Sequence, residues 1–508
     1  LLCTLAIFPC SSPFSHNRKD VPVTDSTTVD MGSRRELFVD TVIVDELSGT
    51  RLRMHRPQPR EVVLRHDKAW EGPFSLYHTV IRDGDRFLLY YRGWQLPKEP
   101  AVYCVAESSD GIHFERPALG MHDWEGRSDN NIFFADEPFT HTFAPFIDTR
   151  PGVPDDERFK AFSRNFVGDG DERNPVLNGF VSADGLHWEL VTDDPIITDG
   201  VFDSQNVGFW SEAEGQYVAY YRTFKDKDAF ESGTRGPTTR AENFRSIMRA
   251  TSDDFRHWEP GILMDYRTDG RAAVVEEFYI NQTRPYFRAP HIYVALPARF
   301  MAGRPAITEE EGEEIGVHET QLTSCSDACF MTTRAGNSWY DRTFMEAFVR
   351  PRIGPSHWSG RCNYPVDGVV QTGREEMSFY VDEHYAQPTN QVRRYTLRLD
   401  GFASVHASQS GGELVTTPLL FSGSELELNY ATSAAGSMRV EIRDQDNEPI
   451  PGYTLQEADD IFGNRIAGRA RWDGNPDLGR LAGTPVRLRF VMRDADLYSL
   501  RFVDSEKQ

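Results

Sequence analysis

The fold is decided by the stretch Ser108-Ser109-Asp110-Gly111-Ile112-His113-Phe114, because copies of it return along the chain. The copies are Ser182-Ala183-Asp184-Gly185-Leu186-His187-Trp188, Ser252-Asp253-Asp254-Phe255-Arg256-His257-Trp258 and, more weakly, Thr332-Thr333-Arg334-Ala335-Gly336-Asn337-Ser338-Trp339, about 70 to 80 residues apart. Ser-x-Asp-Gly is turn chemistry, in which Asp caps its own backbone and Gly accepts a positive φ. We therefore interpret the Asp and His residues of the motif as structural.

A second repeat alternates with the first. Asp83-Gly84-Asp85-Arg86-Phe87-Leu88-Leu89-Tyr90-Tyr91-Arg92 is matched by Glu214-Gly215-Gln216-Tyr217-Val218-Ala219-Tyr220-Tyr221-Arg222, and more loosely by residues 373–380. Four short antiparallel strands per unit are typical of a propeller blade. Five inner strands are expected, and the chain as a whole is predicted to be all-β. The predicted strand starts are near Glu71, His141, Asp203, Glu277 and Arg361.

The pattern changes after about residue 408. Runs such as Met438-Arg439-Val440-Glu441-Ile442 alternate apolar and polar residues, as half-buried sandwich strands do. We predict an export-signal remnant and linker at 1–35, a five-bladed β-propeller at 36–408 and a β-sandwich at 409–508. The last blade is expected to be closed by strands around Phe38 to Val44.

Composition narrows the possible functions. A formal charge of -23 argues against a nucleic-acid partner, which needs clustered basic residues. The apolar stretch Leu1–Phe8 is typical of the end of a secretory signal, so a periplasmic or extracellular protein is expected; a disordered N-terminus is the alternative. No later run is long enough to span a membrane.

The cysteine pattern gives no sign of a metal centre. Cys325 and Cys329 have no second pair or His at zinc spacing, and buried free thiols are expected. We predict no cofactor and no metal ligands, although a structural calcium ion on the propeller axis is conceivable. The oligomeric state is left open.

Constant spacing indicates where chemistry can occur. Glu71 precedes Gly84 by thirteen positions, Asp203 precedes Gly215 by twelve, and Arg361 precedes Gly373 by twelve. Inner strands lie side by side around the axis, so residues at equal offsets should meet at one mouth, and Glu277 fits the same frame. The predicted catalytic residues are Glu71, Asp203 and Glu277. The predicted substrate-binding residues are Trp70, His78, His141, Asn206 and Arg361.

Clustered carboxylates suit glycoside hydrolysis, in which one carboxyl group donates a proton and another acts as base or nucleophile. Alternatively, Glu71 and Asp203 cap turns and Glu277 is an exposed charge beside Glu276, and Asp148 is a rival for the second carboxylate. Two other functions remain open. One is a propeller that binds carbohydrate without catalysis, and the other is a lyase that uses His141 or a tyrosine as base beside Arg361.

The blade motifs, the five inner strands and the trailing sandwich resemble the five-bladed propeller glycoside hydrolases of families 32 and 43 and their family 32-like relatives. The resemblance covers roughly residues 36–508. It implies a carbohydrate substrate, with Glu71 as base or nucleophile, Glu277 as proton donor and Asp203 as a modulator. The Asp-Pro-Asn-Gly, Arg-Asp-Pro and Glu-Cys motifs of the fructan-cleaving enzymes are absent from the corresponding positions, so the expected activity is hydrolysis of another oligo- or polysaccharide.

Overall fold

The computed structural model describes residues 28–505, apart from 98–99, 169–172, 227–242 and 275. The apolar segment Leu1–Phe8, on which the expectation of export rests, lies outside the described residues. Within the described part, helices are few and short, and none could cross a membrane. The helical pieces are α2 (Glu309–Ile315) and the 3-10 turns η1 (Asp155–Glu157), η3 (Glu319–Gln321), η4 (Pro355–His357) and η5 (Gly479–Leu481).

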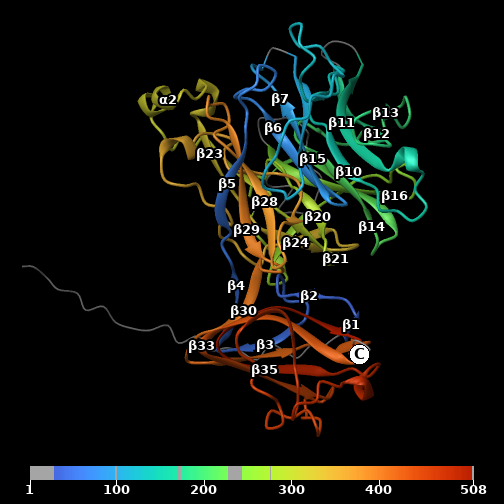
Figure 1. Cartoon of the computed structure of the whole chain (residues 1–508), viewed down its shortest axis with the longest axis vertical. Coiled ribbons are helices and arrows are strands. Elements are labelled where there is room, and N and C mark those ends of the chain that lie inside the picture. The colour runs from blue at the N-terminus through green and yellow to red at the C-terminus, as the bar shows by residue number, and fades with distance from the viewer. Residues whose placement is uncertain (1–27, 98–99, 169–172, 227–242, 275, 506–508) are drawn as a thin grey trace, which may run out of the picture.

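The upper body in Figure 1 is a five-bladed propeller, as predicted. Its first three blades are antiparallel four-stranded sheets. The first contains β6 (Leu76–Asp83), β7 (Arg86–Gly93), β8 (Val102–Ser108) and β9 (Ile132–Phe134). The second contains β10 (Ala144–Ile147), β11 (Phe159–Val167), β12 (Asn174–Ser182) and β13 (Glu189–Leu190). The third contains β14 (Val207–Ser211), β15 (Gln216–Asp226), β16 (Asn243–Ser252) and β17 (Ile262–Leu263).

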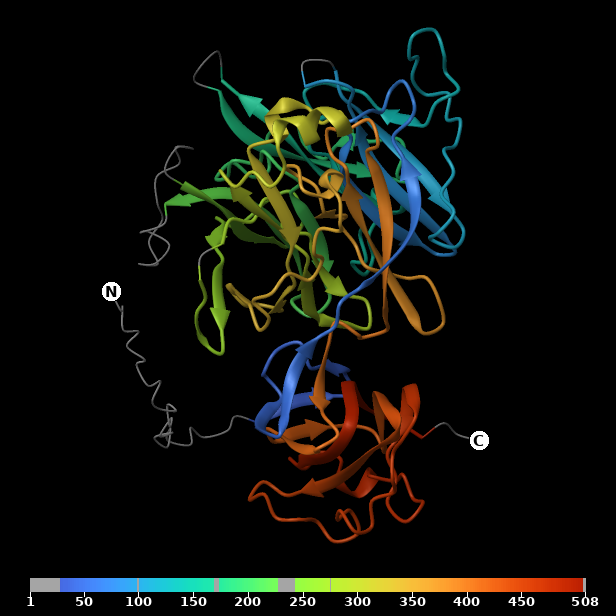
Figure 2. The ribbon, with the colours of Figure 1, turned by 90° about the vertical axis from the view of Figure 1, so that its left-hand side faces the viewer.

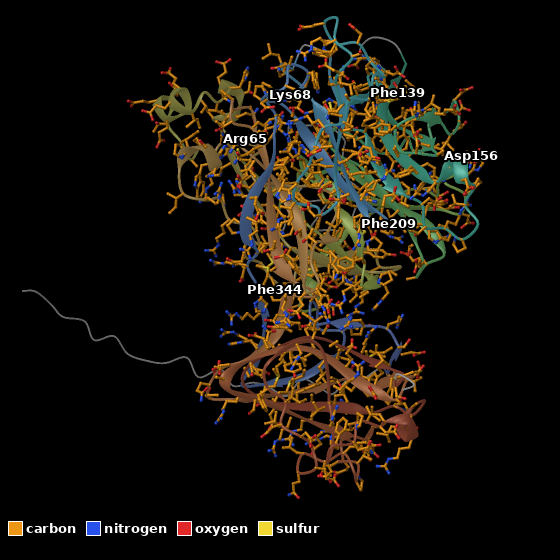
Figure 3. All side chains as sticks on the ribbon, viewed as in Figure 1. Arg65, Lys68, Phe139, Asp156, Phe209 and Phe344 are labelled. Carbon is orange, nitrogen blue, oxygen red and sulfur yellow. The ribbon has the colours of Figure 1, made fainter. Side chains whose placement is uncertain are left out.

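The fourth blade is larger. It contains β20 (Thr283–Tyr286), β21 (Ala289–Ala295), β24 (Met331–Arg334), β25 (Trp339–Asp341), β18 (Asp265–Thr268) and β19 (Arg271–Ala272). Between β21 and β24 in the chain, β22 (Ala298–Ala302) and β23 (Ser324–Ala328) pair antiparallel and form a separate two-stranded sheet. Aromatic side chains join neighbouring blades: Phe209 of the third blade, marked in Figure 3, packs edge-on against Tyr293 of the fourth with ring centroids 5.0 Å apart.

The fifth blade closes the ring with a strand from the beginning of the chain. It contains β26 (Tyr364–Pro365), β27 (Val370–Gln371), β28 (Glu376–Glu383), β29 (Gln391–Arg398) and β5 (Gln58–Arg65). The prediction that strands around Phe38 to Val44 close this blade was wrong, because β5 pairs with β29 and the earlier strands pair elsewhere.

The repeated turn motif has the structural role expected from its sequence. In the first copy, Oδ1 of Asp110 accepts the backbone N–H groups of Ile112 and His113, while Gly111 adopts a φ of 72°. His113 Nδ1 lies 2.7 Å from Oδ2 of the same Asp110. The second and third copies repeat these contacts. The carboxylates of these Asp residues are therefore occupied by hydrogen bonds within their own turns.

Below the propeller lies a sandwich built around the long strands β33 (Glu425–Arg443) and β35 (Arg487–Val503) (Figure 2). Register shifts divide the β33–β35 ladder, and an apolar core fills the unit. The other C-terminal strands are β30 (Ala403–Ala407), β31 (Gly412–Thr416), β32 (Leu419–Phe421) and β34 (Asn464–Arg469). Strands from the chain start complete it: β1 (Val29–Gly32), β2 (Glu36–Leu37), β3 (Val44–Ser48) and β4 (Thr50–Met54).

The first strands thus pair with the last, and their polar residues join the two bodies. Glu36, fully buried, lies 2.8 Å from Nε2 of His291 and 2.9 Å from Nη2 of Arg334, both in the fourth blade. Asp40 pairs with the same Arg334 at 2.9 Å. Although burial raises the pKa of Glu36, Arg334 and His291 lower it to about 2. An ionised carboxylate is therefore built into the contact between the sandwich and the propeller.

Candidate active site

Polar side chains cross the propeller axis and hydrogen-bond to one another. Gln205, just before β14, donates its Nε2 to Oγ1 of Thr79 at 2.7 Å. Gln282, just before β20, donates to Oε1 of Gln205 at 2.8 Å and to the carbonyl of Pro365 at 3.0 Å. These bonds connect the first, third, fourth and fifth blades. They leave little freedom for the backbone at the start of each inner strand.

Two residues after Gln282, in β20, Arg284 pairs with the buried Asp367 of the fifth blade, with Nε 3.0 Å from both carboxylate oxygens. It also donates to the carbonyls of Gly208 and Pro145, in the third and second blades. Because one guanidinium bridges four blades, the interior of the channel is filled. A ligand on this axis must therefore bind at one of its two ends, and the predicted residues Asp203 and Arg361 lie at the end where the inner strands begin.

At that end each blade contributes one residue to a cluster that we call the mouth. The five are Tyr77, His141, Asp203, Tyr279 and Arg361. Tyr77 donates to the backbone carbonyl of Asp203 at 3.4 Å, and its ring centroid lies 6.2 Å from that of His141. The guanidinium of Arg361 lies 5.2 Å from the ring centre of Tyr279. The mouth therefore combines a carboxylate, two phenols, an imidazole and a guanidinium.

The backbone at the mouth is strained. Tyr77, Phe202 and Arg361 have φ values of 60°, 56° and 58°, which residues other than Gly rarely adopt. Each such residue costs of order 1–3 kcal/mol and persists only when its surroundings hold it there. Strain of this kind gathers at functional sites. Its recurrence in three blades supports a functional mouth.

Three arginines surround the mouth from one structural position. Arg92, Arg164 and Arg222 occupy the same place near the end of the second strand in the first three blades. The guanidinium of Arg92 lies between the rings of Tyr77 and Trp94, at 4.7 and 4.4 Å from their centres. Arg222 donates to Oδ1 of Asp203 at 2.6 Å. It also donates to the carbonyl of Tyr279 and lies 4.6 Å from that ring.

Tyr279 has the most cationic surroundings in the mouth. Besides Arg222 and Arg361, Arg245 lies over its ring at 4.8 Å. Burial raises the pKa of Tyr279, but the positive charges, Arg361 and then Arg222 first, outweigh it and lower the pKa below its usual value. For Tyr77, burial and then the neighbouring Tyr279 raise the pKa. Of the two phenols, Tyr279 is thus the one suited to exchange a proton.

His141 is held neutral. Burial, followed by the charges of Arg92 and Arg164, places its pKa well below the usual value. Its backbone carbonyl accepts a hydrogen bond from Nη1 of Arg92 at 3.2 Å. A neutral imidazole at this point can accept a hydrogen bond from one sugar hydroxyl and donate a hydrogen bond to another.

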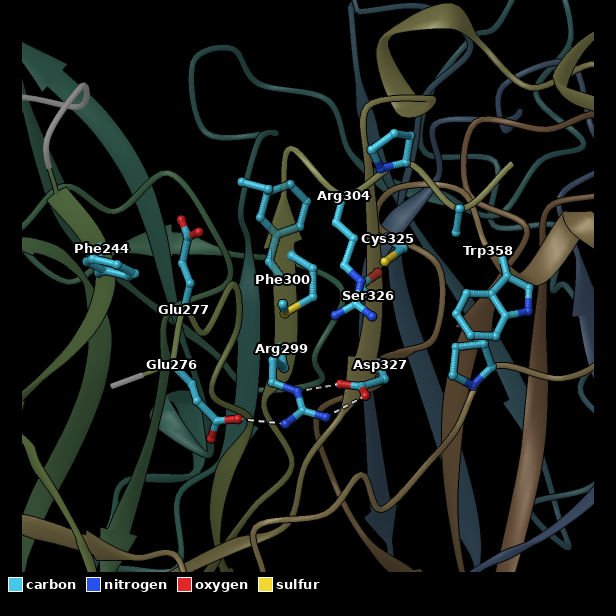
Figure 4. Close-up of a pocket in the computed structure, with 15 residues that line it drawn as sticks. Phe244, Glu276, Glu277, Arg299, Phe300, Arg304, Cys325, Ser326, Asp327 and Trp358 are labelled. Atoms are coloured by element: carbon cyan, nitrogen blue, oxygen red, sulfur yellow. Dashed lines mark hydrogen bonds and ion pairs between the residues drawn. The ribbon is translucent and has the colours of Figure 1, made fainter. Parts of the chain in front are cut away.

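Glu277 connects the mouth to a cavity of about 1070 Å³ (Figure 4). Its carboxylate pairs with Arg245, which also lies over Phe300 at 4.8 Å. Phe300, in turn, packs against Tyr279 with centroids 5.6 Å apart. Figure 4 shows Glu276 and Glu277 turned apart, with Glu276 bound to Arg299. The half-exposed rings of Phe244 and Phe300 and the exposed Trp358 line the cavity and offer surfaces on which a sugar can stack.

The structure brings four of the eight predicted residues together: Asp203, Glu277, His141 and Arg361. Glu71 is not among them, which differs from our expectation. It is fully buried, with Oε1 2.7 Å from Nε of Arg116 and Oε2 2.9 Å from its Nη2. Tyr91 donates to Oε1 at 2.6 Å. The turn before β6 directs Glu71 away from the axis, so its carboxylate binds protein groups rather than facing the mouth.

Three predicted binding residues also lie away from the mouth surface. Trp70 is buried and donates to Oδ1 of Asn131 at 2.8 Å. His78 is fully buried, with Nδ1 2.7 Å from Asp382. Asn206 is buried and donates to the carbonyls of Phe202 and Ser204, so it shapes the Asp203 loop from beneath. The rival acid, Asp148, pairs with buried Lys160 at 2.9 Å.

Sequence reasoning missed Tyr279 and four of the arginines at the mouth, Arg92, Arg164, Arg222 and Arg245. The signal for two of them was present, since Tyr-Tyr-Arg ends the repeated strand in residues 90–92 and 220–222. That repeat was interpreted only as blade structure. Nothing comparable marks Arg245, because it reaches the mouth from β16, the third strand of its blade, where the repeat has no matching arginine.

A second group of potential ligands lies near η4. The ligand atoms of His357, Glu383 and His384 lie within 4.8 Å of one another. Glu383, however, already pairs with Arg352 at 3.0 Å and Arg393 at 3.0 Å. A cation placed there would face two guanidinium charges, so the geometry gives this group no clear metal-binding role.

The sequence matches no family model and no curated protein. It resembles solved structures only in fold. One is described as a glycoside hydrolase, with 11% identity, a TM-score of 0.42, and coverage of 68% of this chain and 92% of that one. Another is a putative glycoside hydrolase from Parabacteroides distasonis, with 13% identity, a TM-score of 0.38, and coverage of 69% and 97%.

A third similar structure is an N-acetylgalactosamine deacetylase from F. plautii in complex with blood group B trisaccharide. Its identity is 10% and its TM-score 0.44, with coverage of 69% of this chain and 96% of that one. The neighbours are thus glycoside hydrolases and related carbohydrate-active propeller enzymes, and none of these three descriptions names family 32 or 43. At such low similarity, a functional argument must rest on the residues of the mouth.

Proposed function

We propose that the protein cleaves glycosidic bonds of an oligo- or polysaccharide at the mouth of the propeller. The observation that best supports this is the position of Arg222, which binds the Asp203 carboxylate and the Tyr279 carbonyl at once. It fixes a carboxylate beside a phenol of lowered pKa in a half-buried site. General acid–base chemistry needs two such groups held in place before substrate arrives.

In this proposal Asp203 is the carboxylate that acts as base or nucleophile, or stabilises the positive charge that develops on the sugar. Tyr279 exchanges a proton with the glycosidic oxygen. Glu277, on the cavity side of Tyr279, is the second carboxylate and the alternative proton donor. His141 and Trp94 bind sugar hydroxyls and a sugar face, and the cavity beyond Glu277 receives the neighbouring sugar units.

The surroundings of Tyr279 also favour a second candidate, β-elimination from a uronic acid unit. There the phenolate removes the proton beside the carboxylate, and Arg361 neutralises the carboxylate. Elimination breaks the other C–O bond of the linkage, between the glycosidic oxygen and the carbon β to the carboxylate. It adds no water, so one product carries a new C=C bond and is an unsaturated sugar. A propeller that binds carbohydrate without cleaving it is the remaining alternative.

The test is incubation of the purified chain with a panel of neutral and acidic polysaccharides, followed by mass spectrometry of the products. Hydrolysis adds one water per cut, whereas elimination gives products lighter by one water. Both should disappear in Asp203→Asn. If no polysaccharide is cut although one binds at the mouth, the protein is a binding module and the proposal is wrong.

A further inference from the structure

We infer that the mouth recognises a saccharide that carries a negative group, with Arg164 and Arg361 as the residues that bind the anion. The inference rests on the proposed function, because it names the substrate class of the same site. Its basis is the balance of charge and hydrogen bonding at the mouth.

Five guanidinium groups lie in or around the mouth, whereas the carboxylates described there are Asp203 in the mouth and Glu277 beside it. Arg222 pairs with Asp203, and Arg245 pairs with Glu277. Three positive charges therefore remain at the mouth of a chain whose formal net charge is -23. Partly buried cations without counter-ions are costly, and a bound anion removes that cost. The five charged groups are Arg92, Arg164, Arg222, Arg245 and Arg361.

The three remaining arginines differ in how well the protein satisfies them. Arg92 is 2% exposed and donates to the carbonyls of Phe74 and His141 while lying between two rings. It is in place before any ligand binds. The positive charge of Arg92 acts on the mouth, but neighbouring rings cover its guanidinium, so a ligand cannot contact it directly. Arg92 therefore strengthens the positive potential without being the contact.

Arg164 is half-buried, and within the described residues its guanidinium forms no ion pair or hydrogen bond. Its Nε is fully buried and has no partner there. The side chain stacks on Phe166 at 4.7 Å. A planar guanidinium held by an aromatic ring and lacking a carboxylate is well placed to bind an anionic oxygen through two N–H groups.

Arg361 reaches the mouth from the fifth blade, whereas Arg164 belongs to the second. It is half-buried between the rings of Tyr279 and Tyr385, at 5.2 and 5.8 Å, and pairs with no carboxylate in the described part of the chain. Its one described polar contact is a long one, 3.5 Å, to the hydroxyl of Tyr385. Arg164 and Arg361 thus bring to the mouth guanidinium groups that form no ion pair within the described residues, although Arg164 lies near enough to Asp203 to feel its charge. A uronate carboxylate and a sulfate ester share the chemistry that would match them.

The test is equilibrium binding by calorimetry, made in the Asp203→Asn background so that turnover does not interfere. The ligands are galacturonate and glucuronate oligosaccharides, their neutral counterparts and a sulfated galactan oligosaccharide. Arg164→Gln is compared with Arg173→Gln, because Arg173 is exposed and stacks on the same Phe166 at 4.9 Å. Loss of a charge-assisted hydrogen bond should weaken binding of the acidic ligand roughly tenfold or more.

We expect an acidic ligand to bind more tightly than its neutral counterpart, Arg164→Gln to remove that preference, and Arg173→Gln to keep it. Tighter binding of the uronates identifies a carboxylate as the anion, and tighter binding of the galactan identifies a sulfate. Equal binding of acidic and neutral ligands, or equal effects of the two substitutions, overturns the inference. Cleavage of a neutral polysaccharide with no preference for acidic ligands would overturn it while leaving the proposed function intact.

Discussion

Arg222 and Asp203 form an ion pair at the mouth. Nη1 of Arg222 donates to Oδ1 of Asp203 over 2.6 Å. The other Nη of Arg222 holds the carbonyl of Tyr279, so one side chain fixes the third and fourth blades relative to each other. Asp203 itself follows the strained Phe202, whose φ is 56°. The acid is therefore positioned by contacts on both sides.

Replacing Asp203 by Asn should abolish cleavage without unfolding the protein. The amide keeps the size of the side chain but cannot act as base or nucleophile, and loss of such a group typically costs at least roughly 100-fold in rate. Turnover of the best polysaccharide and the thermal midpoint should be measured together. Full activity in this variant would remove Asp203 from the chemistry.

Glu277→Gln and Glu71→Gln should separate function from stability. Glu277 faces the cavity, so its replacement should reduce turnover with little change in unfolding temperature. Glu71 neutralises Arg116 inside the protein, and removing one partner of a buried pair costs about 3–5 kcal/mol. Glu71→Gln should thus unfold at lower denaturant concentration yet keep its specific activity when folded. The reverse pattern would restore Glu71 as the catalytic base or nucleophile.

Tyr279→Phe should lower kcat/KM by roughly 10²–10⁴-fold, the usual contribution of a proton-transferring side chain. If Tyr279 donates its proton during hydrolysis, the rate of the unchanged enzyme falls as pH rises through its lowered pKa. If it is the base of an elimination, the rate rises instead. Tyr103→Phe is the control, because Tyr103 is buried and its hydroxyl bonds to no other described side chain. Equal activity in both variants would exclude Tyr279.

Glu36→Gln should destabilise the protein at neutral pH by about 3 kcal/mol, the value of a carboxyl pKa lowered from 4.5 to about 2. A lowered carboxyl pKa stabilises the folded state above the unfolded value, and this contribution is lost as pH falls from about 4.5 to about 2. The difference from the unchanged protein in urea unfolding should therefore shrink over that window. Glu46→Gln, at an exposed position in β3, is the control. A difference independent of pH would contradict the ion-pair account.

The sequence was sufficient to predict the propeller because each blade repeats the same local turn. Ser108, Asp110 and Gly111 bond to one another within four residues, so their pattern is visible without a structure. Closure was not predictable in the same way. β5 pairs with a strand more than 300 residues later, and several strands of similar composition could have taken that place.

The site was predicted in part for a related reason. Equal spacing predicted similar heights on the axis for Asp203 and Arg361, and both lie at the mouth, because spacing along a blade sets height on the axis. It failed for Glu71, since height does not fix direction: the turn at Gly72 points that carboxylate toward Arg116, a residue 45 positions away. Tyr77 takes the corresponding place in the mouth. Long-range partners of this kind are decided by packing and leave no local pattern.

The most direct test of the central claim is product analysis of one polysaccharide panel with the unchanged protein and Asp203→Asn side by side. The account predicts that the unchanged protein releases new chain ends from at least one acidic polysaccharide and that Asp203→Asn binds the same polymer without cutting it. Release of the same products at the same rate by both proteins would contradict the claim that the mouth is the active site.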